Sequence, residues 1–274
     1  MKVIETVLNI GVNKPFEVIH LSDNHLTYAD MRDGERKVLL ANERKQYFKD
    51  PNIVLDYAKK LSKDKNLPIV HTGDLIDFVS YANLEKAKEF VDETDCFIVA
   101  GNHEFSLYVG EAKEDANYRN QSLYLVQKYF KNDIRMSSIC IEDVTFVGLD
   151  NGYYLFDEEE LDYLKKVVDN SEKVVLLLHN PLYDKELFNS IMTYSPAGYL
   201  VGVPKELMQN YPLDRYEQQL ADDITLKTLD YIKNEPKIKA IITGHIHRNY
   251  DGRFNDKIPQ LSTDCFDIRI IKFI

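Results

Sequence analysis

The feature that most constrains this chain is a series of short apolar runs, each followed at once by a small cluster of polar residues. Val174–Leu178, for example, is wholly apolar, as expected of a strand buried on both faces. Between such runs lie longer stretches whose apolar residues recur at helical spacing, which is the pattern of an α/β protein. We therefore predict buried strands at 16–21, 68–71, 96–100, 174–178 and 240–242.

The intervening segments carry signals for helices and turns. Asp50 and Pro51 predict the start of a helix, because Asp is a preferred N-cap and Pro is favoured at the first helical position. Asn83 is expected to cap the next helix, and Asp157 with Glu160 reads as a capping box for a later one. Further elements are expected as strands at 3–10 and within 258–274, as a hairpin of 138–141 with 144–149, and as a helix at 220–232.

Length and composition favour one large core. The chain has 274 residues, of which 44% are apolar, and a chain of this size buries roughly three quarters of its unfolded surface. No linker rich in Pro, Gly or Ser divides it, so we expect a single domain over residues 1–274.

Composition also bears on location and partners. No apolar run approaches the about 18 residues of a membrane span, and the first residues lack the apolar stretch of a signal peptide. Cys96, Cys140 and Cys265 are widely spaced and suit reduced thiols, so we expect a cytoplasmic protein without a membrane partner. The net charge of −11 makes nucleic acid an unfavourable partner.

Five of the apolar runs end in short polar motifs. In α/β sheets the loops beyond the carboxyl ends of strands converge on one crevice, so motifs far apart in sequence are expected to meet. These motifs are SDNH at 22–25, GDLID at 73–77, GNHE at 101–104, HNP at 179–181 and GHIH at 244–247.

The residue types in these motifs indicate metal chemistry. Asp, His and Asn without Cys form a mixed oxygen and nitrogen donor set, which suits manganese, iron or zinc. The motifs contain more such groups than the four that one tetrahedral zinc ion would use. Two ions roughly 3.5–4 Å apart can share a hydroxide and hold a phosphoryl group for in-line attack. We therefore expect two divalent or trivalent metal ions as cofactors.

The order D-x-H, G-D-x-x-D, G-N-H-E, H-x-P, G-H-x-H resembles that of the calcineurin-like metallophosphoesterase superfamily, and it spans most of the chain. The resemblance implies an α/β fold of two mixed β-sheets packed as a sandwich and flanked by helices. It also implies a role for each matching residue. The expected ligands are Asp23, His25 and His247 for the first metal, Asn102, His179 and His245 for the second, and Asp74 as the bridging carboxylate.

The same resemblance implies catalytic residues outside the ligand set. His103 matches a histidine that the superfamily places beside the substrate, and Glu104 matches the acid that orients it. Phosphoprotein phosphatases carry an arginine directly after the second Asp of motif two, where this chain has Phe78. The difference weakens the hypothesis that this chain is a protein phosphatase. Asn180 replaces a second histidine of motif four, at a position that is not usually a ligand.

Three other polar residues near the motifs are given structural interpretations. His20 and His71 each lie three residues before an expected ligand Asp, inside a strand, and are expected to be buried and hydrogen-bonded. Asp77 is expected to cap or brace its own loop, as Asp often does in turns.

Together these patterns favour a phosphoric ester hydrolase acting on a small phosphate monoester or diester through attack by metal-activated hydroxide. Two alternatives stay open, which are a nuclease of the same superfamily and a non-catalytic interaction scaffold on this fold. All seven expected ligands and His103 are present, which favours an enzyme.

The stretch at about 182–216 is long for a connection between two strands and is rich in tyrosine and proline. Long ordered loops are either structural or functional, so both readings are kept: a packed surface insertion, or a lid over the metals. As a lid it would use tyrosines to wall a pocket and Lys185, Lys205 or Arg215 to touch a phosphate.

Overall fold

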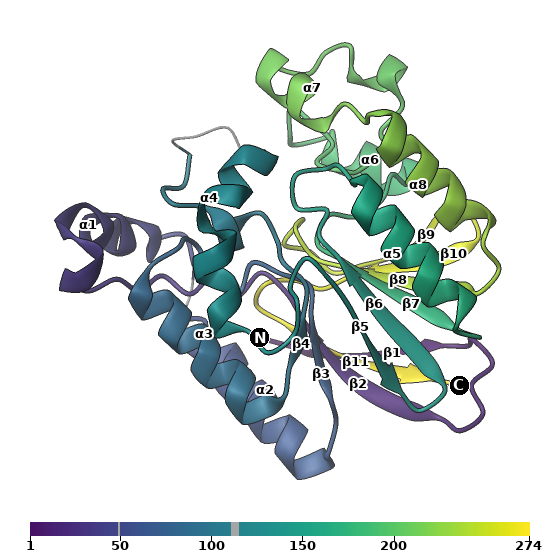
Figure 1. Ribbon diagram of the computed structural model, residues 1–274, viewed down its shortest axis with the longest axis horizontal. Helices are drawn as coiled ribbons and strands as arrows, with labels where there is room; N and C mark the ends of the chain where they lie inside the picture. Colours follow the sequence, from purple (N-terminus) through teal and green to yellow (C-terminus); the bar gives the residue numbers. More distant parts are fainter. Residues whose placement is uncertain (49, 111–114) are drawn as a thin grey trace.

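Two β-sheets packed face to face form the centre of the protein (Figure 1). The computed structural model describes residues 1–48, 50–110 and 115–274. Within these ranges, one sheet has five strands in the order β1-β11-β2-β3-β4 and the other has six in the order β5-β6-β7-β8-β10-β9. The strands are β1 Val3–Leu8, β2 Phe16–Leu21, β3 Ile69–His71, β4 Phe97–Ile98, β5 Met136–Ile141, β6 Val144–Leu149, β7 Val174–Leu178, β8 Ile238–Thr243, β9 Tyr250–Phe254, β10 Ile258–Ser262 and β11 Ile268–Phe273.

The interior between the sheets is apolar. Val18 and Phe273 from the first sheet pack in one cluster with Phe146, Leu177 and other residues from the second. Both sheets are mixed: β2, β3 and β4 run parallel beside antiparallel β11, while β6, β7, β8 and β10 run parallel between antiparallel β5 and β9. The expected sandwich of two mixed sheets is thus confirmed.

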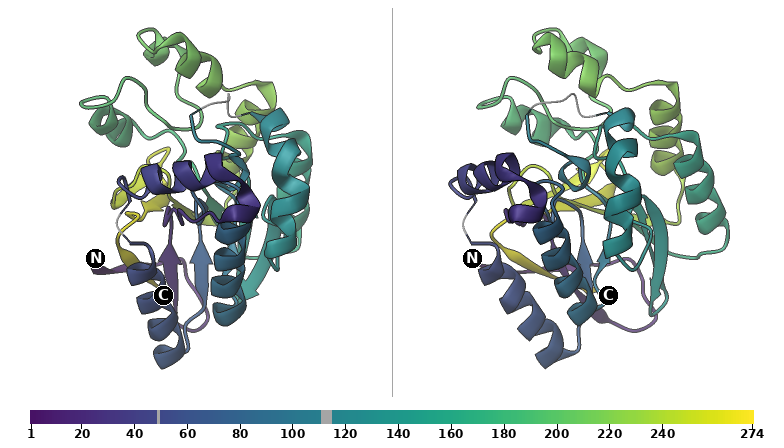
Figure 2. Two further views of the ribbon diagram at one scale, coloured as in Figure 1. Left: turned by 90° about the vertical axis from the view of Figure 1, so that its left-hand side faces the viewer. Right: turned by 60° about the vertical axis from the view of Figure 1, so that its left-hand side comes forward.

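Helices cover the outer faces of both sheets (Figures 1 and 2). On the five-stranded sheet, Val54 of α2 and Leu84 of α3 pack in one cluster with Ile19 and Leu21 of β2. On the other sheet, Leu164 of α5 and Ile232 of α8 pack against β7. The helices are α1 Glu35–Arg44, α2 Asn52–Lys65, α3 Tyr81–Thr94, α4 Ala116–Val126, α5 Glu158–Asp169, α6 Lys185–Ile191, α7 Leu213–Gln219 and α8 Asp223–Asn234, with short 3-10 turns η1 Met31–Asp33, η2 His103–Phe105, η3 Gln127–Tyr129 and η4 Lys205–Met208.

Some element boundaries differ from those predicted. Helix α3 begins after Ser80, whose hydroxyl accepts the N–H of Asn83 at 3.0 Å, so Asn83 lies inside the helix and is not its cap. The strand expected at 96–100 is shortened to β4, Phe97–Ile98. The predicted capping box of Asp157 and Glu160 is confirmed at the start of α5.

Residues 182–216, here named the cap segment, lie beyond the sheets at the top of Figure 1. They hold α6, η4 and the start of α7, and they pack around an apolar cluster of their own that includes Leu187, Phe188, Leu200 and Met208. A short parallel bridge between Leu182 and Val201 closes the base of the segment. Among the described residues, no helix combines the length and apolar character that a membrane span requires.

Candidate metal centre

The seven expected ligands meet at the seam between the two sheets, because each follows the carboxyl end of a strand. Asp23 and His25 follow β2, Asp74 follows β3 and Asn102 follows β4, all in the five-stranded sheet. His179 follows β7, and His245 and His247 follow β8, in the other sheet. Of these side chains only His247 is substantially exposed.

Asp23, His25 and His247 form one group of converging donors. His25 Nε2 lies 3.1 Å from His247 Nε2, and Asp23 Oδ1 lies 3.3 Å from the same His247 atom. Asp23 Oδ1 is buried and has no hydrogen-bond partner among the residues that the structure describes. A buried carboxylate oxygen of this kind is costly unless it is paired or bound to a metal.

A second group lies directly beside the first. His179 Nε2 is 3.2 Å from His245 Nδ1 and 3.2 Å from Asn102 Oδ1. Asp74 stands between the groups, with Oδ2 3.2 Å from His179 Nε2 and 3.8 Å from His25 Nε2. The arrangement allows one carboxylate to serve two adjacent cation positions.

Hydrogen bonds on the far side of two rings set their tautomers. His25 Nδ1 donates to Asp77 Oδ1 at 3.0 Å, and His179 Nδ1 donates to the Thr72 carbonyl at 2.7 Å. These acceptors leave the Nε2 lone pairs directed at the centre, which is the arrangement of metal-binding histidines. Lone pairs and carboxylate oxygens then face one another at 3.1–3.8 Å, so the donor set fits metal ions.

The backbone in the motifs is strained. Asp23, His25, Asp74, His245 and His247 all have φ between 47° and 68°, in the left-handed region that costs non-glycine residues free energy. Such strain clusters at functional sites, where the surrounding structure holds it in place.

Two motif glycines allow the backbone to approach the ligands closely. A Cβ on Gly101 would lie 2.2 Å from Asp74 Oδ1, and one on Gly244 would lie 2.4 Å from Asp23 Oδ2. No side chain larger than hydrogen fits at either position without displacing an expected ligand.

His103 lies beside this centre, but its partner differs from the one expected. Its Nδ1 donates to the Asp77 carbonyl at 2.7 Å and lies 3.3 Å from Asp77 Oδ1. The residue that contacts His103 Nδ1 is thus Asp77, whereas the Glu104 carboxylate accepts hydrogen bonds from backbone N–H groups. His103 also belongs, with His25 and Asp74, to a group of side chains that could hold a metal, although its Nδ1 is engaged by Asp77.

Glu104 instead supports the loops that carry the ligands. Its buried carboxylate accepts N–H groups from Asp74 and Gly101 at 2.7 Å, from Leu75 at 2.7 Å and from Ile76 at 3.3 Å. Four such bonds fix the turn after β3 against the turn after β4.

Asp77 is the residue whose role the sequence least revealed. It receives hydrogen bonds from His25 and His103, and Arg44 of α1 donates to its Oδ2 at 2.7 Å. Burial acts to raise the pKa of Asp77, but these donors hold it well below its usual range, so the carboxylate stays charged. The role of Arg44 follows only from its ion pair with Asp77, which lies in a distant segment of the chain. No local sequence pattern could have predicted it.

His20 and His71 are buried and hydrogen-bonded, as expected. His20 lies between the hydroxyls of Thr72 and Thr263, and His71 contacts Asn24 Oδ1 at 2.9 Å. Burial lowers the pKa of His71 to about 3 and lowers that of His20 as well, so both rings stay neutral.

A cleft of about 450 Å³ opens over one side of the centre. Asn102, His103 and His245 line its floor, and Tyr199 and Arg215 of the cap segment line its wall. Tyr154, from the loop after β6, also lines it and bonds His245 Nε2 through its hydroxyl at 2.8 Å. Tyr154 follows no motif, and sequence reasoning missed it.

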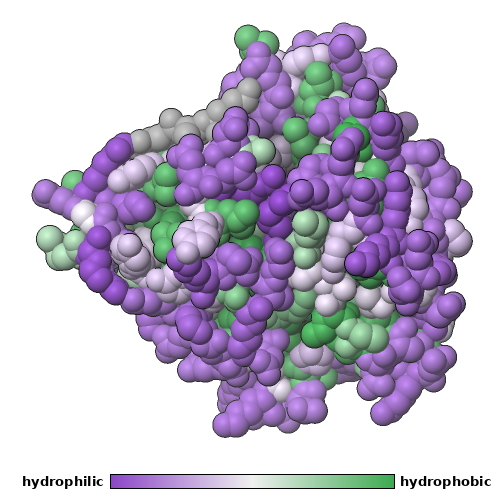
Figure 3. Space-filling model, viewed as in Figure 1, coloured by the Kyte–Doolittle hydropathy of each residue, from purple (hydrophilic) through white to green (hydrophobic). Residues whose placement is uncertain are grey.

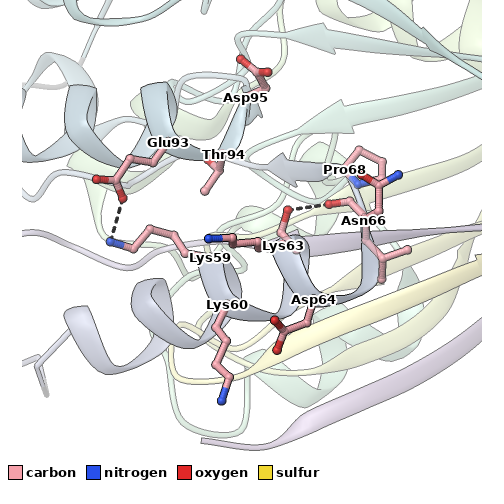
Figure 4. Close-up of a pocket in the computed structure, with 11 residues that line it drawn as sticks. Lys59, Lys60, Lys63, Asp64, Asn66, Pro68, Glu93, Thr94 and Asp95 are labelled. Atoms are coloured by element: carbon pink, nitrogen blue, oxygen red, sulfur yellow. Dashed lines mark hydrogen bonds and ion pairs between the residues drawn. The ribbon is translucent and has the colours of Figure 1, made fainter.

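Another cleft, of about 940 Å³, lies far from these motifs between the C-terminal parts of α2 and α3 (Figure 4). Its charges are of both signs and pair with each other, as Lys59 does with Glu93 at 3.1 Å. None of the expected ligands is among its lining residues.

Comparisons with known proteins agree with this fold. No curated protein matches the sequence. Among solved structures, the chain is similar to a dimetal phosphatase from Danio rerio, at 15% identity and a TM-score of 0.50, covering 91% of this chain and 88% of that one. It is also similar to the phosphopantetheinyl hydrolase of Mycobacterium tuberculosis, at 8% identity and a TM-score of 0.46, covering 96% and 91% of the two chains.

A family model described as calcineurin-like phosphoesterase matches residues 16–249. The match begins at β2 and runs past the last motif, so it contains all seven expected ligands from both sheets. The chain therefore belongs to the calcineurin-like phosphoesterase family.

Proposed function

We propose that this protein is a dinuclear metal-dependent phosphoesterase that hydrolyses a small phosphate monoester or diester. The observation that carries the proposal is the pair of adjacent donor groups that share Asp74 and open into a cleft lined by His103. Catalytic sites need such an open position beside the metal ligands.

In this proposal Asp23, His25 and His247 hold one ion, while Asn102, His179 and His245 hold the other and Asp74 bridges them. When bound, such a metal pair supplies Lewis acidity to the phosphoryl group and activates water for attack on phosphorus. The oxygen and imidazole donors favour manganese, iron or zinc over softer metals. Asp77 and Thr72 hold the His25 and His179 rings in the ligating tautomer.

His103 is proposed to carry the proton that the leaving group requires. The Asp77 carbonyl accepts its Nδ1 proton at 2.7 Å, and the Asp77 carboxylate lies 3.3 Å from the same nitrogen, so Asp77 fixes the orientation of the ring. A protonated ring held in this way can donate from Nε2 to the departing alkoxide. General acid catalysis of this kind contributes about 10²–10⁴-fold to a rate.

The dimensions of the cleft support a small substrate. The volume of the cleft, about 450 Å³, falls within the range of pockets that hold small molecules. The cap segment forms one wall of the cleft. The net charge of −11 adds to the argument against long nucleic acid substrates.

The test is to load the purified protein with manganese, iron or zinc and to assay phosphomonoesters, phosphodiesters and cyclic nucleotides. We expect hydrolysis of at least one small phosphoester together with two metal ions bound per chain. Single-stranded and duplex DNA provide the comparison with a nuclease. Faster cleavage of DNA than of every small ester would contradict the proposal, and so would an absence of any hydrolysis in metal-loaded protein.

A further inference from the structure

The second motif of this chain provides no cation for the substrate. The residue after Asp77 is Phe78, which is fully buried in the core and cannot reach a phosphate. Phosphoesters are anionic, and arginine is the residue best suited to grip them, because its guanidinium presents paired donors. A cation, if this protein uses one, must therefore come from another element.

The cap segment supplies one. Among the described residues that line the cleft, Arg215 is the one Lys or Arg side chain. Lys185 lines a different groove, near β9, and Lys205 does not line the cleft. Of the three cations considered from the sequence, the structure thus selects Arg215.

The guanidinium of Arg215 is held in place rather than left in solvent. Its Cζ lies 5.6 Å from the centre of the Tyr199 ring, and its Nη1 donates to Gln218 Oε1 at 2.8 Å. Asp214 lies 3.5 Å from Nε, but its side chain is 73% exposed, so water screens this pair. Arg215 itself is 38% exposed and retains donors for a ligand.

Tyr199, the support of Arg215, is itself fixed against the metal centre. Its backbone has a φ of 51°, and its N–H donates to the buried Gln219 Oε1 at 3.0 Å. Its ring lies 6.1 Å from the His245 ring and 6.5 Å from that of Tyr154. Tyr199 therefore links Arg215 to an expected metal ligand.

This order of side chains determines which part of a substrate Arg215 can meet. Tyr199 packs against both His245 and Arg215, so the guanidinium reaches the cleft beside a ring that borders the centre. A phosphoryl group bound at the metals would sit on the floor of the cleft, and Arg215 would face whatever extends from it along the wall.

We propose that Arg215 binds a second anionic group, a carboxylate or a phosphate, on the alcohol part of the substrate. The preferred substrates are then small phosphoesters that carry two anionic groups. This inference rests on the proposed function, since it assumes that the scissile phosphoryl group occupies the metal centre. Gln218 and Tyr199 act as positioning residues for the guanidinium.

The experiment measures competitive inhibition of para-nitrophenyl phosphate hydrolysis by the manganese-loaded protein. The inhibitors are alkyl phosphonates and chains of the same length that end in a carboxylate or in a second phosphonate. Because a charge-assisted bidentate pair is formed, the terminal anion should lower the inhibition constant about tenfold at the best chain length. Comparing the two end groups shows whether carboxylate or phosphate is preferred.

Variants test whether Arg215 itself, and not another cation of the cap segment, binds the terminal anion. Arg215→Met should remove the gain from the terminal anion, whereas Arg215→Lys should keep part of it. Lys205→Met removes a cation from the same segment but outside the cleft, and it should keep the full gain. Metal content and the thermal midpoint are measured for every variant.

Two results would overturn the inference while leaving the proposed function intact. One is that the terminal anion brings no gain to the wild-type protein at any chain length, and the other is that Arg215→Met keeps the gain. If metal-loaded wild-type protein hydrolyses neither para-nitrophenyl phosphate nor any other small phosphoester and binds no phosphonate by calorimetry, the proposed function fails and the inference fails with it.

Discussion

The candidate metal centre and the cap segment are built in opposite ways. In the centre, polar side chains are buried between two sheets, and strained backbone and hydrogen bonds from Glu104 and Asp77 hold them. The cap segment has its own apolar cluster and reaches the cleft through Tyr199 and Arg215. The face in Figure 3 is mostly hydrophilic, although hydrophobic side chains are also visible at its top, over the cap segment.

This difference suggests that the two regions have different roles. If the proposed function holds, the sheets fix the groups that would perform the chemistry, because any shift of a strand would move several expected ligands at once. The separately packed cap segment would then determine what fits beside them, and it could vary without disturbing those residues. Substitutions in the two regions should therefore affect different properties.

The largest effect is expected from Asp74→Asn. The Asp74 carboxylate stands between both donor groups, and its replacement removes the negative charge that would screen two cations from each other. Activity should fall to background and metal content should fall below two ions per chain. Asp143→Asn, which removes a partly buried carboxylate that pairs with Lys173 at 2.7 Å in the turn between β5 and β6, serves as the control. Full activity of Asp74→Asn with both ions bound would show that the centre is assembled differently.

His103→Ala should lower turnover by about 10²–10⁴-fold while both ions stay bound. The reason is that the ring is held by Asp77 beside the cleft and is expected to donate a proton and not to coordinate. The loss should be smaller for nitrophenyl esters, whose leaving group needs less protonation, than for alkyl esters. Metal loss in this variant, measured by elemental analysis, would identify His103 as a ligand.

Tyr154→Phe tests the contact between the loop after β6 and the centre. Removing the hydroxyl that bonds His245 Nε2 at 2.8 Å should weaken metal binding by roughly 10–100-fold. Turnover at saturating metal should change little. Tyr153→Phe is the matched control in the same loop and should bind metal like the wild type. Equal affinity in both variants would mean that the Tyr154 hydroxyl does not orient His245.

The smallest effect on turnover is expected from Phe188→Ala in the cap segment. Truncating a buried Phe costs about 3–5 kcal/mol of stability, and the ring packs within the cluster of the cap segment. Hydrogen exchange should rise at 185–219 before it rises in the strands, with both metals retained and with weaker discrimination against bulky esters. Phe146→Ala, between the sheets, should instead lower the stability of the whole protein. Loss of metal in Phe188→Ala would show that the two regions are coupled.

The sequence predicted the centre better than its surroundings, and the reason is physical. A strand buried on both faces, such as β7, is apolar throughout, and it ends where a polar motif begins. That change from apolar to polar residues can be recognised in the amino-acid sequence alone. Since strand ends converge in this type of sheet, the ligands could be grouped before their distances were known.

The elements that sequence reasoning missed lack such a boundary. Helix α1 was not predicted, since Ala41 is its one buried residue and its apolar face is weak. Strand β9 alternates only partly and was also missed. Asp77, Arg44 and Tyr154 owe their roles to contacts across more than twenty positions, which no local pattern encodes.

The position of β11 has a consequence for the order of assembly during synthesis. This strand lies between β1 and β2, pairing with each along its length, although more than two hundred residues separate it from them in the chain. One edge of β2 pairs with β3 and the other with β11. The second edge therefore has no neighbouring strand until β11 has left the ribosome. Because Asp23 and His25 follow β2 directly, metal capture at these two residues should be a late step that follows the emergence of β11, and ribosome-bound fragments that end before 268 should not take up the full complement of metal.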